Sequence, residues 1–146
     1  MSENGKLAKA ALELGRHGSL AVIESEGGGP YVSLVNYASD EKGLPVFLFS
    51  SLARHTRSLL KDQRASLLIA QIPLEGDALA GLRVSFSGIM QQVAPPGVRA
   101  LYISKHPYAE SYAEFGDFGF WKLTPKLVHL VGGFGRIETL EAEAVF

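Results

Sequence analysis

Cysteine is absent from this chain of 146 residues. Disulfide bonds and thiolate chemistry are therefore excluded, and the absence is typical of the reducing cytoplasm, so we expect a cytoplasmic protein. The four histidines show no metal-ligand spacing, such as two histidines separated by three residues. We therefore predict no metal site.

An excess of charge of either sign is also missing, because 14 Lys and Arg side chains face 15 Asp and Glu side chains, for a net charge of -1. A protein that binds nucleic acid through general attraction needs a positive excess, so we expect no nucleic-acid partner. The first residues lack the basic stretch and apolar core of a secretory signal, and no apolar run approaches the length of a membrane span. We therefore expect no membrane partner.

Apolar residues make up 47% of the chain and charged residues 20%, which indicates one ordinary globular domain over residues 1–146. Sixteen glycines and several short apolar runs favour many strands and turns. The runs follow one another through tight turns without crossover helices, so we predict a mainly β (α+β) fold, an antiparallel β-barrel of six or seven strands with peripheral helices. The expected strands are 19–24, 31–37, 46–50, 65–71, 82–91, 118–123 and 127–131.

Helical spacing of apolar residues predicts a helix over 7–14, a second one that ends near Lys61, and a helical pair after residue 97. The glycine within strand 82–91, Gly88, is expected to mark a bulge or a bend. The tail, 138–146, is acidic and without pattern, and we expect part of it to be mobile. The core stripe of the second helix is expected to consist of Leu52, Ala53, Thr56, Leu59 and Leu60.

The start of the second helix has the features of an anion site. A strand delivers the hydroxyls of Ser50 and Ser51 to the helix start, where free N–H groups and the positive end of the dipole attract an anion. Arg54 and Arg57 lie three residues apart on one face and add charged donors. The alternative is that both arginines lie on a solvated helix face. His55, beside them, is a phosphate donor, a cofactor ligand or a surface residue.

Five stretches carry a resemblance to a known family. They are SSLARHTRSLL at 50–60, DQRASLL at 62–68, HP at 106–107, FGDF at 115–118 and HLVGGFGR at 129–136. Together they resemble the FMN-binding split barrels related to pyridoxamine 5′-phosphate oxidase, in particular the haem-utilisation, HugZ-like branch. The resemblance covers roughly residues 7 to 137. Ser58 and Gln63 stand where that branch usually has Asn and Pro.

The resemblance implies a split β-barrel that forms a homodimer and holds FMN at the subunit interface. It implies a flavin-dependent oxidoreductase acting on a small molecule that the residues do not identify. By position, it assigns the phosphate to side chains around the start of the second helix, and the ribityl chain or ring to side chains on neighbouring strands. The implied cofactor residues are Ser33, Asn36, Ser50, Ser51, Arg54, His55, Thr56, Arg57 and Gln71.

Three departures from the family pattern define the alternatives. The oxidases carry Arg and Lys where this chain has Tyr31 and Asn36, and Lys where it has His55. The haem-utilisation branch carries a second domain after the GGFGR segment, which supplies its axial histidine, and that domain is not within residues 1–146. The alternatives are a non-enzymatic module that binds haem or a flavin in haem utilisation, and a structural dimer whose site has decayed.

Overall fold

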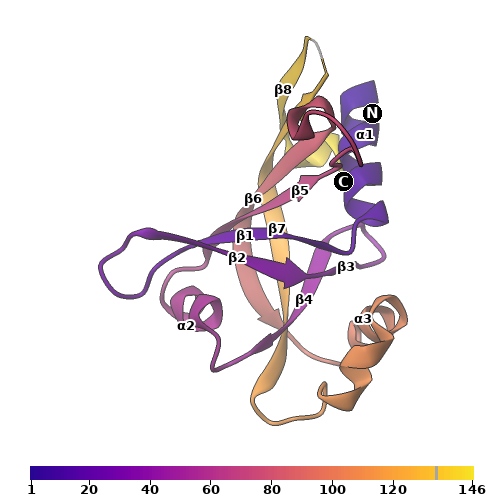
Figure 1. Ribbon diagram of the computed structural model, residues 1–146. Coiled ribbons are helices and arrows are strands. Elements are labelled where there is room, and N and C mark those ends of the chain that lie inside the picture. Colours follow the sequence, from indigo (N-terminus) through magenta and orange to yellow (C-terminus); the bar gives the residue numbers. More distant parts are fainter. Residues whose placement is uncertain (134) are drawn as a thin grey trace.

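A computed structural model describes residues 1–133 and 135–146 (Figure 1). The expected helices and strands are present at close to their predicted positions, joined by short turns. Their bounds are α1 (Glu3–Leu14), β1 (His17–Ile23), β2 (Pro30–Asn36), β3 (Ala38–Ser39), β4 (Pro45–Ser50), α2 (Arg54–Lys61), β5 (Arg64–Ala70), η1 (Ala78–Ala80), β6 (Arg83–Val93), α3 (Arg99–Lys105), η2 (Pro107–Ser111), β7 (Phe118–Gly132), β8 (Arg136–Glu141) and η3 (Ala142–Ala144).

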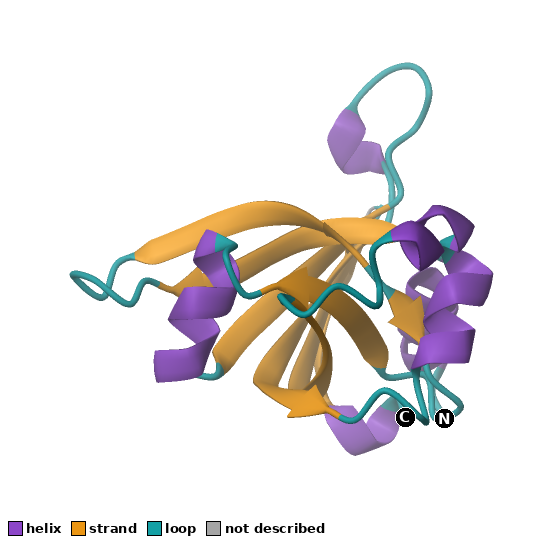
Figure 2. Ribbon diagram, turned by 90° about the horizontal axis from the view of Figure 1, so that it is seen from below, coloured by secondary structure: helices purple, strands orange, loops and turns teal. Residues whose placement is uncertain are grey.

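The strands of the described residues form one curled antiparallel sheet in the order β2-β1-β5-β6-β7-β4-β3, with β8 added beside β7. The sheet curls into a half-barrel, with α2 at one end and α1 and α3 at the other edges (Figures 1 and 2). This confirms the expected mainly β split-barrel fold. Among the described residues, no helix is long and apolar enough to cross a membrane.

The two strands expected over 118–123 and 127–131 are one continuous strand, β7. Pro125 lies in its middle and cannot donate a backbone hydrogen bond to the neighbouring strand. The pairing of β6 with β7 shifts register between Ser87 and Gly88, and Gly88 pairs with Pro125. A Cβ at Gly88 would lie only 2.0 Å from the Thr124 carbonyl oxygen. The irregularity predicted at Gly88 is therefore confirmed. The extra residue of the bulge is Lys126 of β7, which lies between the partners of Ser87 and Gly88.

Alternating side chains of the strands fill the inside of the half-barrel. Leu20, Leu67, Phe86 and Leu130, from four successive strands, have no exposed surface. Helix α1 closes one opening with its own apolar stripe, as its spacing predicts. A second cluster packs α3 and η2 against β4 and includes Tyr102 and Phe120. The second cluster forms one wall of the candidate site described below.

The expected core stripe of α2 is partly wrong. The helix begins at Arg54, because Ala53 is still extended, so Leu52 precedes the helix and is 75% exposed. Leu60 is 60% exposed, whereas Thr56 and Leu59 are buried. A helix of eight residues buries only a narrow stripe, and Leu60 lies about 100° around the axis from Leu59. One side of α2 therefore stays open to solvent.

The tail also differs from its expectation. The chain from Arg136 to Glu141 forms strand β8, paired with β7 over six residues. Val145 is fully buried, and Phe146 packs on the core with its ring 6.1 Å from that of Phe86. The polar residues of 138–146 face outward from an edge strand, which explains why the segment has no apolar pattern.

Candidate functional site

The turn between β4 and α2 is held by the segment that precedes β7. The Ser51 amide donates to the Asp117 carbonyl (2.6 Å), and the Ser50 hydroxyl donates to the Asp117 carboxylate (3.2 Å). Ser50 also accepts from the Leu52 amide (3.1 Å). Ala53 occupies the cap position of α2 and offers no side-chain acceptor. The two serines therefore shape the turn, and they do not cap the helix.

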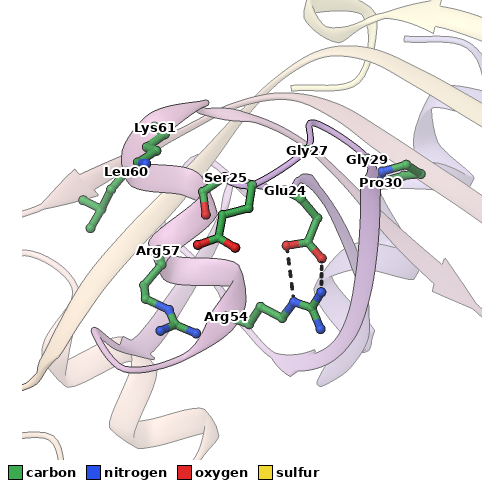
Figure 3. A pocket seen from close by; sticks show the side chains of 10 residues that line it. Glu24, Ser25, Gly27, Gly29, Pro30, Arg54, Arg57, Leu60 and Lys61 are labelled. Atoms are coloured by element: carbon green, nitrogen blue, oxygen red, sulfur yellow. Dashed lines mark hydrogen bonds and ion pairs between the residues drawn. The ribbon is translucent and has the colours of Figure 1, made fainter.

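Arg54 and Arg57 line a broad open hollow of about 980 Å³ between α2 and the β1–β2 hairpin (Figure 3). We call it the charged hollow. Arg54 does not point freely into it. Its guanidinium forms an ion pair with Glu24 at 2.5 Å, and its carbon centre lies 4.7 Å from the middle of the Tyr31 ring. Figure 3 shows the Glu24 carboxylate beside the guanidinium of Arg54.

The charges that line the charged hollow nearly balance. Arg54, Arg57 and Lys61 supply three positive charges, and Glu24 and Glu26 supply two negative charges, for a sum of +1. Arg57 and Lys61 make no ion pair with any described residue. A phosphate bound here would have to compete with Glu24 for Arg54, because one guanidinium fork serves one carboxylate or phosphate at a time.

A second hollow, of about 360 Å³, lies on the other side of the α2 start. We call it the aromatic cavity, because apolar and aromatic side chains form most of its wall. It brings together three of the predicted cofactor residues, Asn36, Ser50 and His55, and Ser33 lies beside His55. The full lining is Leu34, Val35, Asn36, Leu48, Phe49, Ser50, Ala53, His55, Tyr102, Tyr112 and Phe118.

His55 has the polar atoms of its ring largely removed from water. Its Nδ1 lies 3.4 Å from the Ser33 hydroxyl, and the ring meets Phe49 edge-on with centroids 4.2 Å apart. Its Nε2 is buried and has no hydrogen-bond partner among the described residues. Burial lowers the pKa of the His55 imidazole below its usual value, so the ring is neutral at physiological pH. A neutral imidazole with an unused nitrogen is chemically suited to act as a ligand.

No sequence pattern indicates the tyrosines of the aromatic cavity. Tyr102 comes from α3 and Tyr112 follows η2, about fifty residues away from α2 along the chain. The Tyr102 ring packs on His106 with centroids 4.9 Å apart, and the Tyr112 ring packs on Phe118 with centroids 4.9 Å apart. His106 is buried and is not the simple turn residue that its place before Pro107 would suggest. His106 Nε2–H donates to the Tyr37 carbonyl (2.6 Å), which places Nδ1 as the acceptor from the Tyr108 hydroxyl (2.9 Å). Burial raises the pKa of both Tyr102 and Tyr112, so both phenols stay protonated.

The remaining predicted residues lie elsewhere in the subunit. Thr56 is buried behind the first turn of α2, and its hydroxyl has no partner among the described residues. Ser51 is exposed at the turn. Gln71 follows the far end of β5, beside Arg16 and His17, in a third hollow. The nine predicted residues therefore do not converge on one pocket within one chain.

A curled antiparallel sheet with an aromatic cavity beside its short second helix defines a mainly β protein of the split-barrel type. More specifically, the chain belongs to the family described as CREG, beta-barrel, whose sequence model matches residues 1–145. Nearly the whole length of the chain carries that match.

Two known proteins resemble the chain well above the level that shows only a fold. One is the "Non-canonical heme oxygenase HOZ, chloroplastic" of Arabidopsis thaliana, 39% identical over 109 residues, 73% of this chain and 33% of that protein. The other is a solved heme binding protein from Mycobacterium smegmatis, 31% identical with a TM-score of 0.91 over 99% of this chain and 60% of that one. The chain thus spans only one third to three fifths of these relatives.

More distant solved structures share the fold. The heme storage protein HutZ from Vibrio cholerae has a TM-score of 0.65 at 20% identity, over 88% of this chain and 95% of that one. At that identity the likeness concerns the arrangement of strands and not the chemistry of the site. The family and the fold are therefore established by these matches, and the ligand has to be argued from the site.

Proposed function

We propose that this protein binds haem in the aromatic cavity, with His55 as the nearest candidate for an iron ligand. The observation that carries the proposal is the neutral imidazole of His55 in the apolar and aromatic wall of the cavity, with an Nε2 that has no partner among the described residues. Because that nitrogen is buried, the ring would have to turn toward the cavity to reach the iron. Bound haem would supply the iron and the flat conjugated ring. The similarity to a heme oxygenase and to a heme binding protein supports this choice of ligand.

The surroundings of the cavity suit a large flat apolar molecule. Leu34, Leu52, Phe115 and Tyr108 are all more than half exposed, and they belong to the segments that border the cavity. Contiguous exposed apolar side chains on a folded protein mark a place where another surface or ligand is bound. Because the cavity, at about 360 Å³, lies near the lower end of the range typical of ligand sites, part of a ligand the size of haem would extend past its mouth.

The part of the ligand outside the cavity would be covered by a second subunit. We propose a homodimer with the cofactor at the interface. The outward faces of β2 and β5 support it, because Val32, Leu34 and Leu68 are large, apolar and exposed there. A sheet face with these side chains gains from contact with another protein surface.

Titration with hemin tests the proposal. The expected result is a sharp absorption band that saturates at one haem per subunit. His55→Ala should lower the affinity at least about tenfold and shift the band, because the imidazole ligand is lost. His129→Ala is the matched control, since His129 is exposed and lies within hydrogen-bond distance of Thr139 on the outer sheet. Equal affinity and spectra for both variants would remove His55 from the proposal, and no saturable band would end it.

A flavin-dependent oxidoreductase is the second candidate, and Arg57 and Lys61 in the charged hollow favour it because their charges are not used by any described carboxylate. FMN would take its phosphate there. Protein that is yellow as isolated and bleaches on reduction is the expected result. Arg57→Ala should then weaken FMN binding by about 1.5–3 kcal/mol. Colourless protein that does not bind added FMN would contradict this candidate.

A further inference from the structure

The connection between β5 and β6 forms an arm, residues 72–81, that projects from the half-barrel with η1 near its end (Figure 2). Its base is a tight neck. The Gln71 amide donates to the Leu82 carbonyl (2.8 Å), and a Cβ at Gly81 would lie 1.7 Å from the Gln71 carbonyl oxygen. The Arg83 guanidinium donates to the Leu79 carbonyl (3.1 Å). These contacts fix the direction in which the arm leaves the half-barrel.

The arm carries apolar side chains that no described residue covers. Leu74 is fully exposed, Ile72 is 65% exposed and Leu79 is 60% exposed. Two acids, Glu75 and Asp77, lie between Leu74 and Leu79. One oxygen of Asp77 accepts from the Leu79 amide (2.9 Å), which fixes the end of the arm as a short helical turn. Exposed leucines next to acids form a surface suited to an apolar partner with positive charge at its edge.

A groove of that kind lies on the outer face of the same sheet. It measures about 420 Å³, and Ala21, Ile23, Ile89 and Leu127 supply much of its apolar lining. The charged residues that line it are Arg64 and Lys126, and the lining contains no carboxylate. Asp62 partly neutralises Arg64 through an ion pair at 2.6 Å, whereas Lys126 pairs with no described residue. We call it the outer groove.

The arm and the outer groove lie at opposite ends of β5. The groove includes Ala65 and Ser66 near the start of the strand, and the arm leaves after Ala70 at its end. Five residues of strand span about 17 Å. The neck directs the arm away from the sheet, so the arm does not occupy the groove of its own chain (Figure 2). A second copy related by a two-fold axis, with its β5 running the opposite way, would bring each arm to the other copy's groove.

We propose that two copies of this chain exchange their arms, so that Leu74 and its neighbours fill the outer groove of the other copy and Glu75 pairs with Lys126 there. The apolar lining meets the arm leucines, and the acids meet the positive rim. The inference rests on the homodimer part of the proposed function and does not depend on which cofactor is bound. Because the contact is self-complementary, it closes at two copies and does not propagate.

Since the chain has no cysteine, single cysteines report this contact without background. Two variants, Leu74→Cys and Ser66→Cys, are mixed and oxidised mildly, with one of them carrying a size tag. The expected result is a covalent dimer containing one of each, because a disulfide forms only when the two Cα atoms lie within about 7 Å. Glu41→Cys, in an exposed turn away from the groove, is the control partner and should cross-link far less.

Charge reversal tests the pairing. Lys126→Glu should raise the dimer dissociation constant at least about tenfold, and Glu75→Lys in the same chain should restore it, as measured by sedimentation. If the protein is a dimer but Leu74→Cys cross-links to Ser66→Cys no better than to Glu41→Cys, the arm exchange is overturned. The homodimer proposal then still stands. A monomer at micromolar concentration would overturn both.

Hemin titration of the same variants separates this inference from the haem proposal. At a protein concentration where Lys126→Glu is still dimeric by sedimentation, the expected result is unchanged haem affinity. If Lys126→Glu lowers the haem affinity and leaves the dimer dissociation constant unchanged, the outer groove binds the carboxylates of the ligand. That result would overturn the arm exchange. Failure of hemin to bind wild-type protein that still cross-links would overturn the haem proposal alone.

Discussion

The charged hollow and the aromatic cavity begin at adjacent residues and have opposite character. The Arg54 side chain lies at the broad, open charged hollow and pairs with Glu24. The His55 side chain lies at the small aromatic cavity, where its imidazole is neutral. A helix turns by about 100° for each residue, which is enough to send neighbours to different sides of the same element. One short helix thereby separates an ionic surface from an apolar one.

The largest difference between the two regions should appear in stability. Phe49 is buried, stacks on Phe47 with centroids 5.2 Å apart and forms a wall of the aromatic cavity. Phe49→Ala should lower the free energy of unfolding by about 3–5 kcal/mol, because it enlarges a cavity in the core. Arg57→Ala, in the charged hollow, should change it by less than about 0.5 kcal/mol. Urea unfolding measures both, and similar losses would show that the hollow is structural.

The pH dependence of stability should single out the aromatic cavity next. The pKa of folded His55 lies below 6.5, so the unfolded chain takes up a proton first as the pH falls. The free energy of unfolding therefore decreases from about pH 6.5 down to the lower folded pKa, and it is fully retained above that range. His106 has the same direction of shift and should contribute the rest of the slope.

Urea unfolding at a series of pH values measures this slope. His55→Gln should make the dependence shallower, because glutamine does not titrate. An unchanged slope in His55→Gln would mean that the imidazole is solvated in the folded protein.

The smallest expected effect on stability is that of the Arg54–Glu24 ion pair. Arg54 is 60% exposed in this pair, so Glu24→Gln should change the free energy of unfolding by at most about 1 kcal/mol. The same substitution removes the carboxylate that competes for the guanidinium, so affinity for inorganic phosphate should rise. Isothermal titration measures it, with Glu41→Gln as the control. No gain in phosphate affinity would mean that the charged hollow is not an anion site.

The sequence predicted the fold well, because nearly every strand has a short apolar run with a two-residue period and a turn on each side. It also located the start of α2 and its neighbours. The Arg54–Glu24 pair could not be predicted, because it depends on how the β1–β2 hairpin curls toward α2. The same holds for Tyr102 and Tyr112, which reach the cavity because α3 and η2 pack against β4.

The separation of the predicted cofactor residues has a similar cause. The resemblance assigned these residues by their position along the chain, and position along the chain carries no information on which end of a long strand meets which helix. Gln71 and His55 both flank the sheet, yet they lie near opposite ends of it. The assignment of all nine residues to FMN therefore stays a prediction.

The neck of the arm has a consequence for how this protein tolerates change. The Gln71–Leu82 hydrogen bond and the side-chain-free position at Gly81 close the loop before the arm begins, so what lies beyond them adds no constraint to the half-barrel. Lengthening a loop beyond a closed base costs little entropy. Residues 72–81 therefore form a grafting point, where a foreign peptide or an affinity tag can be inserted with the half-barrel left intact, at the expense of the proposed arm exchange.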